Sequence, residues 1–233
     1  MRGKSAFHVD LQKHYLVLFK TGTPSLSQKL RLFMINMGLH CVAVYRLGQA
    51  AKRVRQKHKV IGALMNIVYL TLRYAVVFMH KVELGQKTEI GPGFRVCHVG
   101  NVYVSAWKIG ENCTITHNVT IGLGLTGSED KLPTIGNDVW IGTGSVVVGD
   151  IKIGDGATIS AGSIVTRDVP AGCLVAGNPA RVISRAYDNS EMLVYSMKHR
   201  VALESDSREG MTSGRSEESM AAAVGGAVES GRT

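Results

Sequence analysis

The sequence predicts a left-handed parallel β-helix of hexapeptide repeats, an all-β fold, with an α-helical N-terminal region and a disordered C-terminal tail. Two observations carry this prediction. Aliphatic residues recur every six positions through the middle of the chain, and glycine often follows them. The charge is also uneven, because residues 1–81 hold 14 basic residues and one acidic residue, a net of +13, out of a total of +9. We therefore expect three parts, namely 1–81, 82–185 and 186–233.

The N-terminal part has apolar residues spaced by three or four positions, which is typical of helices. Gly38 is the expected break, and Ser25 or Ser27 is the candidate cap of the helix before it. The strong positive charge predicts either a solvated basic face or an anionic partner, such as a membrane surface rather than nucleic acid.

One helix of this part is unusually apolar. The run 60–79 is long enough to cross a bilayer, but Asn66 and Arg73 lie near its middle, where a charge is costly. We therefore interpret it as a buried or membrane-surface helix and not as a span. The chain begins without the charged-then-apolar pattern of a signal peptide. We expect a cytoplasmic protein with peripheral association at the inner membrane face.

The β-helix is predicted from thirteen aliphatic positions in steps of six. This period fits neither a helix nor a hairpin, but it fits triangular coils in which each short strand sends one side chain inward. Glycine is expected at corners that need unusual backbone angles. The larger of two interruptions inserts the glycine-rich segment GLGLTGSEDKLPT after Ile121, and we expect 122–134 to leave the coil as a functional loop. The thirteen positions are Leu84, Ile90, Val96, Val102, Ile109, Ile115, Ile121, Ile135, Ile141, Val147, Ile153, Ile159 and Val165.

The C-terminal part becomes rich in Ser, Glu, Gly and Ala from about residue 187. After a short helix around 192–203, it has too few large apolar side chains to offset the entropy of ordering them. The four cysteines form no CxxC pair, so we expect neither a disulfide framework nor a metal site.

These motifs resemble those of a known family. The hexapeptide ladder, THNVTIG, PTIGNDVWIGTGSVVVG and AGNPARVI resemble the hexapeptide-repeat acyltransferases. Within them, NMGLHCVAVYRLGQA and VELGQKTEIGPGFRVCH are similar to serine acetyltransferases and their polysaccharide-modifying relatives. The resemblance covers roughly residues 20–185. It implies a homotrimer, or a multiple of three, that transfers an acyl group from coenzyme A to a hydroxyl or amine.

The resemblance also implies which residues are catalytic. His98 stands where serine acetyltransferases have their catalytic histidine, and Glu83 stands where they have the aspartate that partners it. Histidine suits a general base because its pKa lies near the working pH, and a carboxylate on the other ring nitrogen would fix its tautomer. His117, in THNVTIG, is the alternative base, since other hexapeptide acyltransferases also use a histidine at a coil corner.

By the same resemblance, acetyl-CoA is the expected donor, and no metal is required. Thr143, Ala161 and Thr166 would line a groove for the pantetheine arm, where small side chains allow close approach of the backbone. Arg181 would contact a phosphate.

The acceptor site departs from the serine acetyltransferase pattern. That family holds the ammonium of serine with two aspartates, and the matching positions here are Thr23 and Cys97. Lys131 and Leu132 stand where the family has an arginine–histidine pair. Because a desolvated ammonium without a carboxylate is costly, we predict a sugar hydroxyl as acceptor, in exopolysaccharide or glycan biosynthesis. Serine O-acetyltransferase of cysteine biosynthesis is the first alternative, and a catalytically inactive trimeric binding scaffold is the second.

Overall fold

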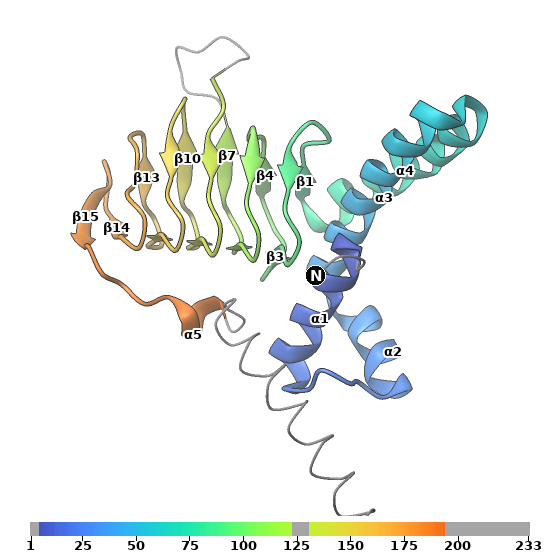
Figure 1. Ribbon diagram of the computed structural model, residues 1–233, viewed down its shortest axis with the longest axis horizontal. Helices are drawn as coiled ribbons and strands as arrows, with labels where there is room; N and C mark the ends of the chain where they lie inside the picture. The colour runs from blue at the N-terminus through green and yellow to red at the C-terminus, as the bar shows by residue number, and fades with distance from the viewer. Residues whose placement is uncertain (1–4, 123–130, 194–233) are drawn as a thin grey trace, which may run out of the picture. The chain divides into compact units, whose positions relative to one another are not determined.

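The computed structural model describes residues 5–122 and 131–193, which form four helices followed by a parallel β-solenoid (Figure 1). The solenoid ends in a short helix, and the segment predicted to be a disordered tail lies outside the described residues from 194 onward. The helices are α1 (Ala6–Phe19), α2 (Leu26–Ile35), α3 (Met37–Lys57), α4 (Lys59–His80) and α5 (Ser190–Leu193).

The strands form three sheets, one on each face of the coil, and neighbouring coils pair in parallel throughout the first two. The first contains β1 (Val82–Leu84), β4 (Val102–Val104), β7 (Thr120–Gly122), β10 (Val146–Val148) and β13 (Ile164–Val165). The second contains β2 (Glu89–Ile90), β5 (Lys108–Ile109), β8 (Thr134–Ile135) and β11 (Lys152–Ile153). The third contains β3 (Arg95–Val96), β6 (Thr114–Ile115), β9 (Trp140–Ile141), β12 (Thr158–Ile159), β14 (Leu174–Ala176) and β15 (Arg181–Ser184), the last antiparallel to β14.

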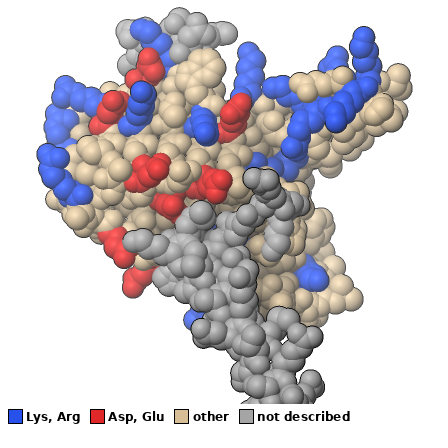
Figure 2. Space-filling model, viewed as in Figure 1, with Lys and Arg blue, Asp and Glu red and all other residues tan. Residues whose placement is uncertain are grey.

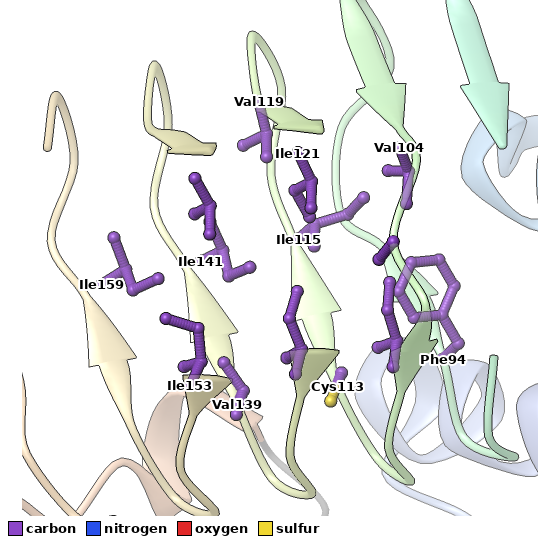
Figure 3. Close-up of a cluster of buried hydrophobic side chains, with 14 of the residues drawn as sticks. Phe94, Val104, Cys113, Ile115, Val119, Ile121, Val139, Ile141, Ile153 and Ile159 are labelled. Atoms are coloured by element: carbon purple, nitrogen blue, oxygen red, sulfur yellow. The ribbon is translucent and has the colours of Figure 1, made fainter. Parts of the chain in front are cut away.

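The predicted β-helix is confirmed in its inward ladder. All thirteen six-spaced aliphatic residues are buried, with at most 7% of any of them exposed. Strand pairing stacks equivalent residues of successive coils, for example Ile115 on Ile141 and Ile141 on Ile159, and these side chains fill the interior (Figure 3). Of the expected loop 122–134, the two end residues belong to the coil, because Gly122 ends β7 and Thr134 begins β8, and 123–130 lie outside the described residues.

The glycines that follow the aliphatic residues have a different role from the one predicted. Gly110 and Gly142 do not adopt positive φ angles. Instead, a Cβ atom on Gly142 would lie 2.6 Å from the backbone nitrogen of Ala161 in the next coil, and one on Gly110 would lie 2.5 Å from the carbonyl oxygen of Gly136. Glycine is therefore required at these positions because adjacent coils approach closely.

The bend between α2 and α3 is 89° and lies at Asn36, two residues before the predicted break at Gly38. The Asn36 side chain caps α3 by accepting a hydrogen bond from the Leu39 backbone N–H at 2.8 Å. Gly38 lies inside the first turn of α3, where a Cβ atom would meet the Val96 carbonyl oxygen at 2.1 Å. Its small size lets α3 pack directly on β3. Ser25 caps α2 as predicted, in a capping box with Gln28.

The side chains of α3 satisfy the free edge of the second sheet. The Tyr45 hydroxyl donates to the Thr88 carbonyl oxygen at 2.6 Å and accepts from the Ile90 N–H at 3.1 Å. Arg46 donates to the carbonyl oxygens of Ile90 and Gly91 at 2.6 and 2.7 Å. The backbone groups of β2 that have no neighbouring coil are thus paired with α3.

Helix α1 is attached to the solenoid by two buried charged residues. Asp10 accepts hydrogen bonds from the Arg46 Nε at 2.8 Å and from the Phe94 backbone N–H at 3.0 Å, so one carboxylate joins α1, α3 and the first coil. The Lys13 Nζ donates to the carbonyl oxygens of Gly93 and Asn112 at 3.0 and 2.9 Å, and also to the Cys113 carbonyl and the Thr114 hydroxyl. Burial lowers the pKa of Lys13 to about 7.

The apolar run predicted as a buried or membrane-surface helix forms α4. Of the residues of α4, only Gly62 and Tyr69 are buried. The helix therefore packs on α3 with one face and exposes the other. In the described part of the chain, α4 is the only unbroken helix that is long and apolar enough to cross a membrane.

We predict that Ile153→Asp prevents folding, because it places an unpaired carboxylate inside the ladder. The loss of unfolding free energy should exceed about 4 kcal/mol, the range of severe core substitutions. The matched control is Ile183→Asp, because Ile183 is 64% exposed on β15. Urea unfolding monitored by circular dichroism measures both variants. A folded Ile153→Asp protein with the stability of Ile183→Asp would contradict the inward placement of this position.

We also predict that Lys13 makes the unfolding free energy depend on pH. An unfolded lysine has a pKa of about 10.4, whereas burial lowers the pKa of folded Lys13 to about 7. Between these values the unfolded chain binds more protons, so stability rises with pH by up to about 1.4 kcal/mol per pH unit. Below about pH 7 both states are protonated and the gain is absent. The pH profile of Lys13→Met should lack this rise, whereas that of Lys29→Met, at an exposed lysine, should retain it. Parallel profiles for Lys13→Met and the unmodified protein would contradict the prediction.

Candidate functional site

Two histidines lie side by side at one corner of the solenoid. His98 and His117 each follow the inward aliphatic residue of their coil by two positions, and Val96 and Ile115 are paired in register. Their ring centroids are 5.8 Å apart, and the rings meet edge to face at 76°. His98 is exposed, whereas His117 is partly buried. The structure therefore brings the predicted base and its alternative to the same place.

The two rings differ in how they are held. In the described part of the chain, the Nδ1 atom of His117 is buried and has no hydrogen-bond partner. The contact that the structure gives the His98 side chain is the ring of His117, and its exposure leaves it free to meet a substrate. His98 is thus better placed to receive a proton from an external hydroxyl, and His117 forms the wall beside it.

At the same corner of the next two coils, the positions equivalent to the histidines hold the small residues Thr143 and Ala161. The Gly144 N–H donates to the His117 carbonyl oxygen at 3.2 Å, and the Gly162 N–H donates to the Thr143 carbonyl oxygen at 2.8 Å. Thr143 and Ala161 therefore follow the histidines in one row, each two positions after a buried isoleucine. This row joins two of the predicted coenzyme A residues to the histidine pair.

The other two predicted coenzyme A residues lie near the end of the solenoid. Thr166 directly follows β13 in the first sheet and is exposed. Arg181 begins β15, and its exposed guanidinium donates to the Ala180 carbonyl oxygen at 3.1 Å. Thr166 thus lies at the corner between the first and second sheets, the corner of Lys131, whereas Arg181 lies in the third sheet, whose strands precede the histidine row.

Glu83, the predicted partner of the base, lies in the middle of β1. In the structure its carboxylate forms an ion pair with Arg73 of α4. Among the described residues, no hydrogen bond joins Glu83 to His98. The pairing of Glu83 with His98 therefore stays a prediction. In the structure Arg73, the charged residue within the apolar run 60–79, is the partner of Glu83 instead.

The predicted acceptor residues lie in three different places, two of them corners of the solenoid. Cys97 is partly buried and adjoins His98, and its N–H donates to the Ile115 carbonyl oxygen at 2.8 Å. Lys131 and Leu132 precede β8, at the corner between the first and second sheets. Thr23 lies exposed in the turn between α1 and α2. Within one protomer, the sheet that contains β7 separates the histidine corner from the corner of Lys131.

Sequence reasoning treated the two histidines as rivals and missed that they are neighbours. The signal was present, because 19 residues separate them, which is one three-strand coil plus the single extra residue of the first interruption. The burial of Lys13 against carbonyl oxygens left no such signal, since a single lysine in a helix is usually solvated.

Comparisons with known proteins identify the relatives of this chain. Residues 133–167 match the family model for the bacterial transferase hexapeptide (six repeats). The serine acetyltransferase of Bacillus licheniformis is 33% identical over 163 residues, which cover 69% of this chain and 70% of that protein. Serine acetyltransferase 2 of Arabidopsis thaliana is 31% identical over 190 residues, which cover 80% of this chain but only 55% of that protein. The chain thus spans about half the length of this longer relative.

Solved structures that resemble this chain are also serine acetyltransferases. Serine acetyltransferase from Brucella abortus in complex with coenzyme A is 27% identical, with a TM-score of 0.62, and the match covers 78% of this chain and 67% of that one. Neisseria gonorrhoeae serine acetyltransferase in complex with serine is 25% identical, with a TM-score of 0.59 and coverages of 76% and 67%.

These comparisons show that the predicted sugar acceptor, and with it the role in exopolysaccharide biosynthesis, is wrong. The relatives and structural neighbours are consistently serine acetyltransferases. The prediction failed because it equated the absence of two carboxylates with the inability to hold an ammonium.

Proposed function

The chain belongs to the serine acetyltransferase family of hexapeptide-repeat acyltransferases, and we propose that it transfers the acetyl group of acetyl-CoA to the hydroxyl of L-serine. The observation that carries this proposal is the corner row, in which an exposed histidine stands beside small residues that extend along the solenoid. Such a row offers a base at one end and a surface for the donor along the rest.

The reaction needs a proton acceptor at the serine hydroxyl. In the proposed mechanism His98 removes this proton while the serine oxygen bonds to the acetyl carbonyl carbon. When the carbon–sulfur bond breaks, the imidazolium returns the proton to the departing thiolate, so the histidine ends as it began. Glu83 would assist by orienting the imidazole if it exchanges its Arg73 partner for His98.

We place the donor along the corner row beyond the histidines. Thr143 and Ala161 present backbone groups with little side-chain bulk, which suits the amide groups of a pantetheine arm. Arg181, exposed at the last coil, would meet a phosphate at the far end.

We propose that the working unit is a homotrimer. The separation of Lys131 and Leu132 from the histidine corner supports this, because one protomer cannot place both corners around one substrate. In a threefold arrangement, the histidine corner of one copy would face the Lys131 corner of the next.

We propose a cytoplasmic location. The four cysteines, Cys41, Cys97, Cys113 and Cys173, all lie in the described residues and are all free thiols, which suits a reducing compartment. Burial raises the pKa values of Cys41 and Cys113 to about 12, so both are unreactive core residues at neutral pH.

We predict that the purified protein consumes acetyl-CoA when L-serine is added, with a KM in the micromolar-to-millimolar range. L-Alanine keeps the ammonium and carboxylate but lacks the hydroxyl, and 3-hydroxypropanoate lacks the ammonium, so neither should be acetylated. Release of the coenzyme A thiol measures the rate. If L-serine causes no release above the background hydrolysis, the proposed activity is wrong.

We further predict that His98→Ala lowers turnover with L-serine by roughly 10²- to 10⁴-fold, which is the usual effect of losing a general base. Coenzyme A binding, measured by calorimetry, should stay unchanged. His117→Ala is the matched control, and it should have the smaller effect on turnover because His117 is the less exposed of the two rings. The reverse ranking of the two variants would assign the base to His117.

A further inference from the structure

The outer face of α4 is an apolar surface that no described element covers. Exposed large apolar side chains lie along the whole helix, and at 100° per residue five of them fall within about one third of its circumference. The inner face packs closely on α3, where a Cβ atom on Gly62 would lie 2.3 Å from the Arg55 Cα atom. We define the α4 stripe as Ile61 (54% exposed), Leu64 (60%), Ile67 (60%), Val68 (53%) and Phe78 (78%).

Basic residues are concentrated in the hairpin that carries this stripe. Between residues 11 and 82 the sequence contains no Asp or Glu. Lys and Arg line the hairpin of α3 and α4, where no acidic side chain is visible in this view, whereas side chains of both signs lie over the solenoid (Figure 2). At the far end of α4, the Lys81 ammonium lies 5.2 Å from the centroid of the Phe78 ring. A helix with an exposed apolar face and lysines at its ends is typical of the membrane interface.

An open pocket of about 340 Å³ lies beside the hairpin, between α3, α4 and the turn after β1. Three basic residues line it, Lys52, Arg55 and Lys87, together with Ala51, Asn66 and Gln86. Among the described residues, none of these three cations forms an ion pair. Asn66 follows buried Gly62 by four positions, so the pocket lies on the inner side of α4, where its cations add to the positive charge of the hairpin without sharing the face of the stripe.

Two other arrangements fit the same observations less well. If α4 crossed a bilayer, the exposed charges at the end of α3, which packs along it, would be drawn into the hydrocarbon. A second copy packed symmetrically on the stripe would bring two basic hairpins together, and like charges would oppose the contact.

We propose that the α3–α4 hairpin docks the enzyme on an anionic lipid surface. The α4 stripe lies at the boundary between headgroups and acyl chains, and the cations of the hairpin, Lys52 and Arg55 among them, are attracted by the anionic headgroups. This inference is independent of the acceptor, because vesicle binding and serine acetylation are separate measurements.

The test is flotation of the full chain with vesicles of phosphatidylcholine alone or of equimolar phosphatidylcholine and phosphatidylglycerol. We expect binding to the anionic vesicles, weakened by salt, and little binding to the neutral ones. The double variant Lys52→Glu with Arg55→Glu should bind at least about 25-fold more weakly, at about fivefold per basic residue lost. Arg167→Glu with Arg185→Glu, the same charge change on the exposed solenoid surface, should bind like the unmodified protein.

A second pair of variants tests the stripe. Ile67→Asp should abolish flotation, whereas Ile183→Asp, at a residue of similar exposure (60% and 64%) on β15, should not. Circular dichroism and serine acetylation in solution should be unchanged in both. Failure of the unmodified protein to float with anionic vesicles would overturn the proposal. So would self-association that Ile67→Asp abolishes without any vesicle binding, since a second copy would then cover the stripe.

Discussion

The stacking of equivalent residues in successive coils is the constraint on which the site depends. Backbone hydrogen bonds fix the register of the third sheet, so Ile115, Ile141 and Ile159 lie directly above one another. Every residue that follows them by two positions must then fall on one straight edge. This is why residues far apart in the sequence, His117, Thr143 and Ala161, form a continuous row. Glycines such as Gly142 set the spacing of that edge, because the next backbone leaves no room for a Cβ atom.

The helical region is joined to this rigid scaffold by polar contacts that are buried. Asp10 contacts both Arg46 and the first coil, and Lys13 reaches the carbonyl oxygens of two coils. Burial raises the pKa of Asp10, although Arg46 opposes this shift, and the same desolvation lowers the pKa of Lys13. Both groups are costly to bury, so they fix the position of α1 only because their partners are complete. The position of α1 on the solenoid therefore rests largely on directional bonds, since three of its four buried residues are polar.

Periodicity made the solenoid predictable, because one residue in six must point inward and the pattern repeats thirteen times. Single residues were less predictable where their role depends on a distant partner. Gly38 was assigned to a bend because glycine breaks helices, but it serves a contact with Val96. Glu83 was assigned to a histidine, and in the structure it pairs with Arg73. The acceptor prediction was wrong because it considered only the side chains at two positions. Backbone carbonyl oxygens, which every residue carries, can also accept hydrogen bonds from an ammonium group.

The closing strand β15 has a consequence for how the protein behaves in a crowded solution. The last coil of a parallel solenoid exposes unpaired backbone N–H and C=O groups, like those with which each earlier coil pairs to the next. A strand of another molecule could pair with these groups and continue the solenoid. Here β15 runs antiparallel to β14 and reverses the chain at the end of the longest sheet. At the opposite end, the Tyr45 and Arg46 side chains already occupy the backbone groups of β2. The third sheet at one end and the second sheet at the other therefore have edges that a further parallel coil could not simply extend.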